Sequence, residues 1–482
     1  MADQLPTYPI TERTCPYDPP AGLLELQSQA PLVRVQLPTG PAWLVTGYDA
    51  ARALLDDPRM SSDMGREGFP TLYKQKMRPV LKGSFMRMDG DDHAFYRTML
   101  AGEFSVKRVA AMRPEIEEAC DQLLDEMVRK GPPTNLHEAY GIPVSSRSIC
   151  RLLGVPYEDS EFFTTHLEAL FDPHRAGAPE RIAASKAALS GYLDELVTRK
   201  QKDPGDDMIS RLVADYLVPG KVERPELLLT SYLLLAAGHE TTANMITTGT
   251  AALLMHPEQL TAVRDEPQLL RGAVEELLRY LSIFQFGITR IAVEDVTFGD
   301  QTVAAGEGII VSPLLGNRDQ DVYGDPHTLD VRRRSRPHLS FGHGPHLCVG
   351  HTLARIELQI AFERLLARLP DLSLAVPASE VPFRTETLVF GTVDLPVTWG
   401  GRTAEGLRVS AAAEPGRLLR VDHAACCRSG ACSLVAPDLF DQGDDGKVLL
   451  KTARPPAHLW EAAEEAADYC PVSAIELETL PE

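Results

Sequence analysis

A ten-residue stretch, residues 341–350, constrains the fold of this chain more than any other. It reads Phe-Gly-His-Gly-Pro-His-Leu-Cys-Val-Gly, so that one cysteine, Cys348, lies in a loop dense with glycine. The run that follows, residues 351–369, has apolar residues at helical spacing. A cysteine just before a helix N-terminus is favoured as a thiolate, because unpaired N–H groups and the helix dipole stabilise negative charge there. The glycines remove side chains where something flat and wide would have to approach the backbone.

The loop resembles the haem-binding loop of cytochromes P450, Phe-x-x-Gly-x-x-x-Cys-x-Gly, at Phe341, Gly344, Cys348 and Gly350. A bare Cys-x-Gly carries no information, and a buried cysteine in a glycine-rich turn is the alternative, but four fixed positions form a specific pattern. The resemblance implies a mainly α fold with small β-sheets, in which Cys348 binds the iron of haem b (iron-protoporphyrin IX). Phe341 and Gly350 would then contact the haem.

Four further residues would bind the haem through its propionates. On a helix, His93 and Arg97 lie four residues apart on one face, where they can bind a carboxylate together. A lone His-x-x-x-Arg is more often a solvated helix face, but its position resembles that of the family's helix whose His and Arg bind a haem propionate. The resemblance assigns Arg290 and His346 to the propionates as well.

Residues 225–254 are predicted to form one long helix, interrupted at residues 237–242, Ala-Gly-His-Glu-Thr-Thr. Glycine and two β-branched residues weaken a helix locally, so that a hydroxyl is released from backbone pairing and can hold a small ligand or water. The segment resembles the family's oxygen-activation sequence, Ala/Gly-Gly-x-Asp/Glu-Thr. The resemblance implies that Thr241 hydrogen-bonds dioxygen, that Glu240 relays protons to it, and that Gly238 contacts the haem.

A structural network is expected beside the cysteine loop. Glu276 and Arg279 can meet on one face of a predicted helix, although Glu-x-x-Arg alone is weak evidence. The pair corresponds to the family's buried Glu-x-x-Arg, which a later arginine completes. The resemblance points to Arg333 as that third member, with Arg332 and Arg334 beside it.

Short strands surround these motifs. Residues 60–88 show no clear period and are predicted to form a long loop over a pocket, and residues 389–393 a turn that reaches it. The predicted strands are residues 32–37 and 42–46, paired as a hairpin, and residues 296–298, 301–303 and 309–315.

A second group of cysteines lies near the C-terminus. Cys426, Cys432 and Cys470 fit the Cys-x₂-Cys-x₂-Cys and Cys-Pro arrangement of bacterial ferredoxins when Ser429 takes the middle position. Three thiolates suit a [3Fe–4S] cluster, and the segment resembles the small ferredoxins that serve bacterial cytochromes P450. Cys427 is either an incidental neighbour or a competing ligand. A zinc site is the alternative, but adjacent Cys426 and Cys427 lack the usual Cys-x₂₋₄-Cys pairs.

The chain is predicted to comprise a P450 haem domain at residues 1–400, a linker at 401–415 and a small α+β ferredoxin-like domain at 416–482. A length of 482 residues agrees with more than one core. The last segment carries 6 Lys/Arg against 12 Asp/Glu, and this net charge of −6 suits docking on basic redox surfaces.

Composition and charge exclude several classes of function. A net charge of −20 argues against nucleic acid or an anionic membrane surface as the main partner. The first 20 residues have neither a basic region nor an apolar core, so no signal peptide is predicted. The most apolar run, residues 227–239, is shorter than the roughly 20 residues of a membrane anchor. Half of the cysteines lie in metal-like settings, as expected of a reducing cytoplasm.

These features predict a haem-thiolate monooxygenase that inserts one oxygen atom of O₂ into an apolar small organic substrate, by hydroxylation or epoxidation, with electrons from its fused ferredoxin. No Gly-x-Gly-x-x-Gly follows a predicted strand, so a separate NAD(P)H-dependent ferredoxin reductase is expected. One alternative is a haem-thiolate enzyme that uses peroxide or catalyses coupling or rearrangement. Another is a non-catalytic haem sensor or electron carrier.

Overall fold

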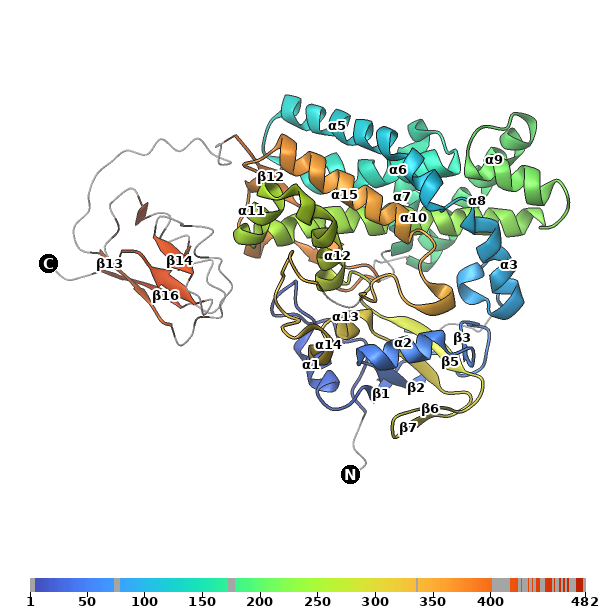
Figure 1. The fold of residues 1–482 in the computed structure, drawn as a ribbon, viewed down its shortest axis with the longest axis horizontal. Coiled ribbons are helices and arrows are strands. Elements are labelled where there is room, and N and C mark those ends of the chain that lie inside the picture. The colour runs from blue at the N-terminus through green and yellow to red at the C-terminus, as the bar shows by residue number, and fades with distance from the viewer. Residues whose placement is uncertain are drawn as a thin grey trace.

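The computed structural model describes residues 5–72, 79–171, 178–334 and 337–400. In the C-terminal part it describes residues 417–423, 426, 432, 436, 439–442, 447–452, 455, 459–460, 463, 466–467 and 474–479. Over residues 5–400 helices dominate, and the strands β1 (Leu32–Leu37), β2 (Gly40–Val45), β3 (Met60–Ser61) and β5 (Ile288–Ala292) lie together at one side of them (Figure 1). The expected mainly α fold with small β-sheets is therefore confirmed.

The α-helices of this part follow one another in chain order. They are α1 (Ala21–Gln27), α2 (Tyr48–Asp56), α3 (Gly90–Ala101), α4 (Val106–Ala111), α5 (Arg113–Lys130), α6 (Ile142–Leu153), α7 (Ser160–Phe171), α8 (Ala178–Lys202), α9 (Met208–Leu212), α10 (Arg224–Leu254), α11 (Pro257–Asp265), α12 (Leu270–Leu281), α13 (Pro313–Gly316), α14 (Gln320–Tyr323) and α15 (His351–Arg368).

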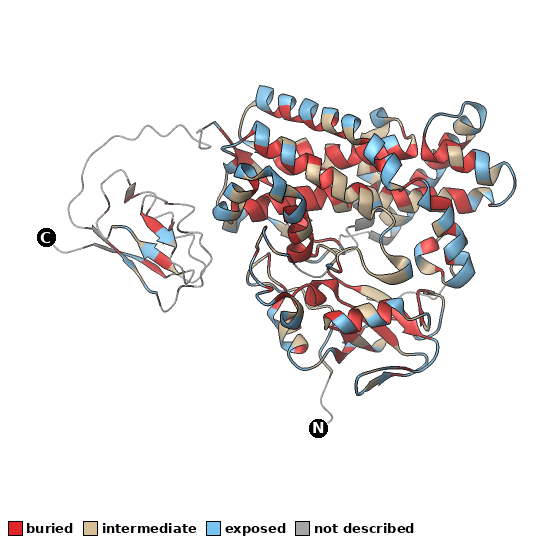
Figure 2. Cartoon of the chain, viewed as in Figure 1, coloured by how far each residue is buried: buried red, intermediate tan, exposed pale blue. Residues whose placement is uncertain are grey.

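The 31-residue helix α10 forms the centre of the helical part and is about 46 Å long at 1.5 Å per residue. It begins with a capping box between Glu223 and Glu226, with Pro225 in its first turn. Helices α6, α12 and α15 pack on it, and α5 packs on α15 (Figure 1). Almost every residue of its C-terminal half is buried, including threonines and an asparagine (Figure 2). A helix buried on all sides is typical of the core of a large domain.

The interruption expected at residues 237–242 does not occur, since α10 is continuous. Packing outweighs the weak local helix propensity. A Cβ on Gly238 would lie 2.7 Å from Cδ1 of Ile149 in α6, so this glycine allows the two helices to approach closely. The hydroxyl of Thr241 is not released either, because it donates to the carbonyl of Ala237, one turn earlier, at 2.7 Å.

The largest sheet has five strands in the order β1-β2-β8-β5-β3. Its β1–β2 hairpin is the one expected, β2 and β8 are parallel, and the other pairs are antiparallel. The strand predicted at residues 309–315 ends at Val311, because Pro313 begins α13 and Ser312 caps that helix. The strands are β1 (Leu32–Leu37), β2 (Gly40–Val45), β3 (Met60–Ser61), β5 (Ile288–Ala292) and β8 (Gly308–Val311).

Smaller sheets complete this part. The two strands predicted at residues 296–298 and 301–303 form the hairpin β6–β7. Another hairpin, β10–β11, packs against α10, and next to it Val389 bridges to Phe284. Their bounds are β4 (Thr134–Asn135), β6 (Val296–Phe298), β7 (Gln301–Val303), β9 (Ser373–Leu374), β10 (Phe383–Arg384), β11 (Gly391–Thr392) and β12 (Pro396–Thr398), and β12 lies between β4 and β9.

The C-terminal part has its own strands and its own apolar core. Strand β13 (Arg417–Val421) pairs with β16 (Ile475–Thr479), and β14 (Phe440–Gln442) pairs with β15 (Val448–Leu450), both antiparallel. Leu419, Phe440 and Trp460 are among its buried core residues. The predicted linker lies outside the described residues, so the domain boundaries stay a prediction. No helix in the described parts of the chain combines the length and apolarity that crossing a bilayer requires.

Candidate functional site

The loop before α15 holds Cys348 by hydrogen bonds across its own backbone. The N–H of Cys348 donates to the carbonyl of Phe341 at 2.9 Å, and the N–H of Leu347 donates to the carbonyl of Gly344 at 3.0 Å. Gly350 is the N-cap of α15, and its N–H is hydrogen-bonded to the Cys348 thiol. Cys348 therefore lies where expected, just before the N-terminus of a helix.

The surroundings of the thiol have opposing effects on its charge. Burial raises the pKa of Cys348, while the Gly350 N–H and the positive charges of Arg97 and Arg355 act against that rise. The residue is nonetheless accessible. Protein surrounds and desolvates the Cys348 side chain, and part of its surface is still accessible. It therefore faces an open space within the fold. The thiol is thus placed to bind a group that enters this space.

The contact with α2 requires a glycine at position 344. Its φ of +70° lies in the region that favours glycine, and a Cβ there would lie 2.7 Å from the carbonyl oxygen of Leu55. The glycines were expected to make room for a flat group. At Gly344 the end of α2 occupies the position of the missing side chain instead. This glycine therefore lets the cysteine loop pack directly against α2.

An accessible stripe also runs along the middle of α10. Ala237 is exposed, and Leu233 and Thr241, one turn to either side, are half-buried, although most of the helix after this stripe is buried. Exposure in the middle of a core helix requires an open space against that face. The hydroxyl of Thr241 borders this space.

Three arginines, of which Arg290 is buried and Arg97 and Arg87 are half-buried, lie near the cysteine loop. Burial, together with the neighbouring charge of Arg87, lowers the pKa of Arg290 to about 10. Burial also lowers the pKa of Arg97 and of Arg87. Among the described residues, none of the three forms an ion pair with a carboxylate. Buried positive charge without a counter-charge is costly, so this cluster is suited to bind an anionic group.

Two imidazoles lie beside these arginines. The rings of His93 and His346 stack, with centroids 3.9 Å apart. Nε2 of His346 lies 3.0 Å from Oγ of Ser62 and 3.7 Å from a carboxylate oxygen of Asp89. Burial and the charge of His346 lower the pKa of His93 to about 4. The buried Nε2 of His93 has no hydrogen-bond partner among the described residues.

The expected acid–alcohol pair is present, but its two members lie on different faces of α10. Glu240 is buried, and its Oε1 accepts hydrogen bonds from Nη1 of Arg384 at 2.6 Å and from Nδ2 of Asn244 at 3.0 Å. Thr241 borders the accessible stripe. Neither Arg384 nor Asn244 was singled out from the sequence, because no motif marks them and Arg384 is distant along the chain.

The Glu276 network forms as expected. Arg279 binds Glu276 through two hydrogen bonds of 2.7 and 2.8 Å, and Nε of Arg333 lies 3.1 Å from the same carboxylate. Arg332 pairs with Glu266 instead. Arg279 also donates to the carbonyls of residues 317, 326 and 328, so that the network joins α12 to the segment that leads to the cysteine loop.

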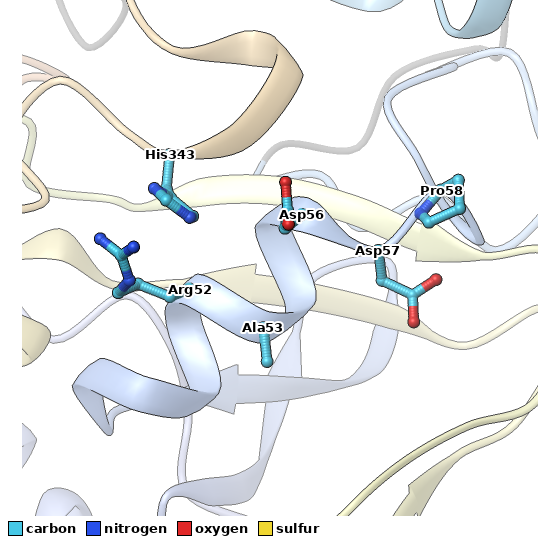
Figure 3. Close-up of a pocket in the computed structure, with 6 residues that line it drawn as sticks. All are labelled: Arg52, Ala53, Asp56, Asp57, Pro58 and His343. Carbon is cyan, nitrogen blue, oxygen red and sulfur yellow. The ribbon is translucent and has the colours of Figure 1, made fainter.

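A surface hollow of about 390 Å³ lies where the end of α2 meets the cysteine loop (Figure 3). It is bordered by both signs of charge, and none of the residues expected to bind haem lines it. We therefore do not assign it to the haem. Its lining residues are Arg52, Ala53, Asp56, Asp57, Pro58 and His343.

Two of the four C-terminal cysteines are described. Cys432 is buried and Cys426 is half-buried, and both contact the same small apolar core. The N–H of Cys426 donates to the carbonyl of Asp422. Cys427 and Cys470 lie outside the described residues. The two described thiols thus share one protected environment, which suits a bound cluster.

Known proteins match this architecture over most of the chain. The pentalenic acid synthase of Streptomyces avermitilis is 45% identical over 80% of this chain and 96% of its own length. The vitamin D3 dihydroxylase of Streptomyces griseolus is 44% identical over 82% of this chain and 97% of its own length. The family described as Cytochrome P450 matches residues 166–396. The chain belongs to the cytochrome P450 family.

Solved P450 structures share the fold. The crystal structure of cytochrome P450 MoxA from Nonomuraea recticatena has a TM-score of 0.76 and 43% identity, and it covers 82% of this chain and 99% of MoxA. Residues 419–477 match a different family, described as a 4Fe-4S single cluster domain. This protein is thus a P450 monooxygenase with a C-terminal ferredoxin-type domain, which extends beyond the P450 relatives named above.

The residues of this P450 fit a haem. The structure has an accessible thiol at Cys348 and a cluster of three arginines that pair with no carboxylate among the described residues. It also has a buried His93 nitrogen for which the described residues provide no hydrogen-bond partner. Arg87 was missed by the sequence reasoning, since it lies in a stretch without periodicity. Only the fold brings it beside Arg290, where its Nη1 donates to Oγ1 of Thr289 at 3.1 Å.

Proposed function

We propose that this P450 monooxygenase inserts one oxygen atom of O₂ into an apolar small organic substrate and receives its electrons from its own C-terminal domain. A separate NAD(P)H-dependent ferredoxin reductase would reduce that domain. The observation that carries the proposal is the match of a cluster-type domain in the same chain as a P450, with Cys426 and Cys432 in contact with its core. A donor on the same chain needs no encounter by diffusion.

The cluster would be of the [3Fe–4S] type. The matching family is described as binding a 4Fe–4S cluster, which takes four thiolates. In this chain Ser429 stands where the middle cysteine of the Cys-x₂-Cys-x₂-Cys run is expected. Cys426, Cys432 and Cys470 would therefore be the three ligands, with Cys427 as a neighbour that does not bind.

Each residue of the haem site would have a separate task. A haem bound through Cys348 would supply the activation of O₂. Arg97, Arg290, His93 and His346 would bind its propionates, and the expected contacts of Gly238, Phe341 and Gly350 with the haem stay part of this proposal. Thr241 would hydrogen-bond O₂ from the accessible stripe of α10 after its hydroxyl turns away from the carbonyl of Ala237. Glu240 would pass protons towards that hydroxyl.

The substrate would be apolar. The accessible stripe of α10 consists of Leu233, Ala237 and Thr241, so one hydroxyl borders an otherwise aliphatic surface. Two relatives bear the names of different compounds, pentalenic acid and vitamin D3. These names support a class of substrate and not one compound.

The reaction can be tested with the full-length protein, a ferredoxin reductase, NAD(P)H and ¹⁸O₂. A panel of apolar compounds is first screened for those that shift the spin state of the haem. We expect such compounds to yield product with one ¹⁸O atom, and only when reductase is present. Product formed with peroxide alone would favour the peroxide-dependent alternative. A panel that gives neither a shift nor product would favour a sensor or electron carrier.

The haem ligand can be tested separately. Cys348→Ser should abolish the red-shifted Soret band of the reduced carbon monoxide complex, because that band requires an axial thiolate. Cys120→Ser is a matched control, since Cys120 is a buried cysteine of α5 and not a residue of the loop. A Cys348→Ser variant that kept the band would contradict the ligand assignment.

A further inference from the structure

The proposed proton-relay acid is bound by an arginine from the hairpin β10–β11. Nη1 of Arg384 donates to Oε1 of Glu240 at 2.6 Å. The Glu240 side chain is only 3% exposed, whereas that of Arg384 is 25% exposed. This ion pair therefore joins a buried carboxylate on α10 to a partly accessible guanidinium.

Glu240 is turned away from the residue that it would serve. Successive residues on an α-helix differ in direction by about 100°. Thr241 borders the accessible stripe with Ala237, while Glu240 lies with Asn244, whose Nδ2 donates both to the Glu240 carboxylate and to its backbone carbonyl. The carboxylate is thus directed towards the partly accessible guanidinium of the hairpin and away from the accessible stripe.

Arg384 is fixed by the backbone of its hairpin. It pairs with Gly391 of β11, and β11 packs on α10. A Cβ on Gly391 would lie 1.7 Å from Oδ1 of Asn244, so only glycine permits this approach. The carbonyl of Arg384 accepts a hydrogen bond from Nε2 of Gln285 at 3.3 Å. The guanidinium therefore extends from a well-supported position.

We propose that Arg384 is a positioning residue for proton delivery, which holds the Glu240 carboxylate in the place from which it relays protons to the Thr241 face of α10. The inference rests on the proposed function of Glu240 as the proton relay. A buried carboxylate needs an opposite charge to offset the loss of hydration, and Arg384 supplies it.

The neighbouring imidazoles cannot replace this charge. His137 and His239 both interact electrostatically with Glu240. Burial lowers the pKa of His137 to about 4 and lowers the pKa of His239 as well, so both rings are neutral at pH 7. Without Arg384, the carboxylate would lose its cationic partner and the shorter of the two hydrogen bonds that direct it.

The test compares R384A, R384K and E240Q in the full-length protein with reductase, NAD(P)H and a substrate that gives a spin-state shift. We expect R384A to lower product formed per NAD(P)H by about tenfold, with hydrogen peroxide released instead, since positioned proton transfer contributes at least that much. The solvent deuterium isotope effect on turnover should rise. R384K should recover part of the loss, because an ammonium group can still pair with Glu240. R34A, which removes the unrelated ion pair with Glu307, is the matched control.

The double variant E240Q/R384A separates positioning from general support of the fold. We use coupling for the amount of product formed per NAD(P)H consumed. If Arg384 acts through Glu240, the double variant should have the same coupling as E240Q alone or higher. The R384A substitution should also lower the Tm more in the wild type than in the E240Q background. Additive effects on coupling and on Tm would overturn the role of Arg384. So would a fully coupled R384A beside an uncoupled E240Q. If E240Q itself remained fully coupled, the proposed relay would fail, and with it the inference.

Discussion

The buried carboxyl of Glu357 shows how the surroundings of a single residue set its charge. Glu357 of α15 is buried, and its carboxyl lies 3.4 Å from Oγ1 of Thr242 in α10. Burial raises the pKa of Glu357 to about 8, and hydrogen bonds from Ser148 and Thr242 act against that rise. At neutral pH the group therefore keeps its proton and fits between three helices as a neutral side chain.

This shift has a consequence for stability. In the unfolded chain the carboxyl of Glu357 ionises near its ordinary value of 4.5, so between about pH 5 and pH 8 the unfolded state binds fewer protons than the folded state. The contribution of Glu357 to the free energy of unfolding is full below pH 4.5. It is lost as the pH rises towards 8, by up to about 1.4 kcal/mol per unit.

The Glu357→Gln side chain does not titrate. The free energy of unfolding of this variant, relative to that of the wild type, should therefore rise between pH 5 and pH 8, by at most about 1.4 kcal/mol per pH unit. Thermal unfolding of both proteins at pH 5, 6.5 and 8 measures the difference, in which the other titrating groups cancel. A difference independent of pH would mean that the folded protein holds Glu357 ionised.

The proposed cluster ligands are three of the four C-terminal cysteines, and each can be tested by substitution. Cys426→Ser, Cys432→Ser and Cys470→Ser should each lose the iron–sulfur cluster, because three thiolates are its proposed ligands. Cys427→Ser should retain it and is the matched control. Iron and sulfide analysis with electron paramagnetic resonance measures the outcome. If Cys426→Ser retained the cluster and Cys427→Ser lost it, Cys427 would be the ligand and Cys426 the neighbour that does not bind.

At the scale of elements, the position of the cysteine loop depends on its contact with the end of α2. Gly344 adopts a φ of +70°, and its Cα faces the carbonyl of Leu55 and the side chain of Asp56. The Glu276 network joins α12 to the segment that precedes the loop. The thiol is therefore held from two directions that are unrelated in sequence.

Gly344→Ala should loosen this arrangement. A left-handed backbone costs a residue with a Cβ about 1–2 kcal/mol, and the contact with a backbone oxygen at 2.7 Å adds to this, since backbone cannot rotate away. We expect a lower Tm and a smaller fraction of haem bound through thiolate, measured from the carbon monoxide spectrum. Gly299→Ala is a control at positive φ with nothing near its Cβ. Equal losses in both variants would show that backbone strain acts alone.

At the scale of the whole molecule, one chain combines two units that differ in size and in evolutionary relatives. The P450 relatives named above are covered over almost their whole length by about four fifths of this chain. A different family matches residues 419–477. About four fifths of the chain thus corresponds to almost the whole length of these P450 relatives, and residues 419–477 match a separate family.

Truncation after Gly401 should therefore leave a folded haem domain that turns over slowly with reductase alone. A flexible linker of 15 residues has a root-mean-square span of roughly 20 Å. Tethering at that range gives an effective donor concentration on the order of millimolar. We expect the truncated C-terminal domain, added at micromolar concentrations, to restore part of the rate with saturation. Equal rates for truncated and full-length protein with reductase alone would exclude the C-terminal domain as the donor.

Local patterns in the sequence predicted what depends on neighbours along the chain. The spacing of Cys348 from the start of α15, the β1–β2 hairpin and the His93–Arg97 pair on α3 each follow from side chains within one or two turns. The Glu276 network could be completed with Arg333 because a family pattern links distant segments. The first three features were predictable because helix periodicity and turn chemistry are local.

Only the tertiary structure decided what depends on contacts between distant segments. Helix α10 stays continuous because Gly238 packs against Ile149, although local propensity favours a break. Arg384 reaches Glu240 across 144 positions of the chain, and Arg87 comes beside Arg290 from a stretch without periodicity. A buried charge selects its partner by distance and desolvation in the folded state, and neither quantity is written in the local sequence.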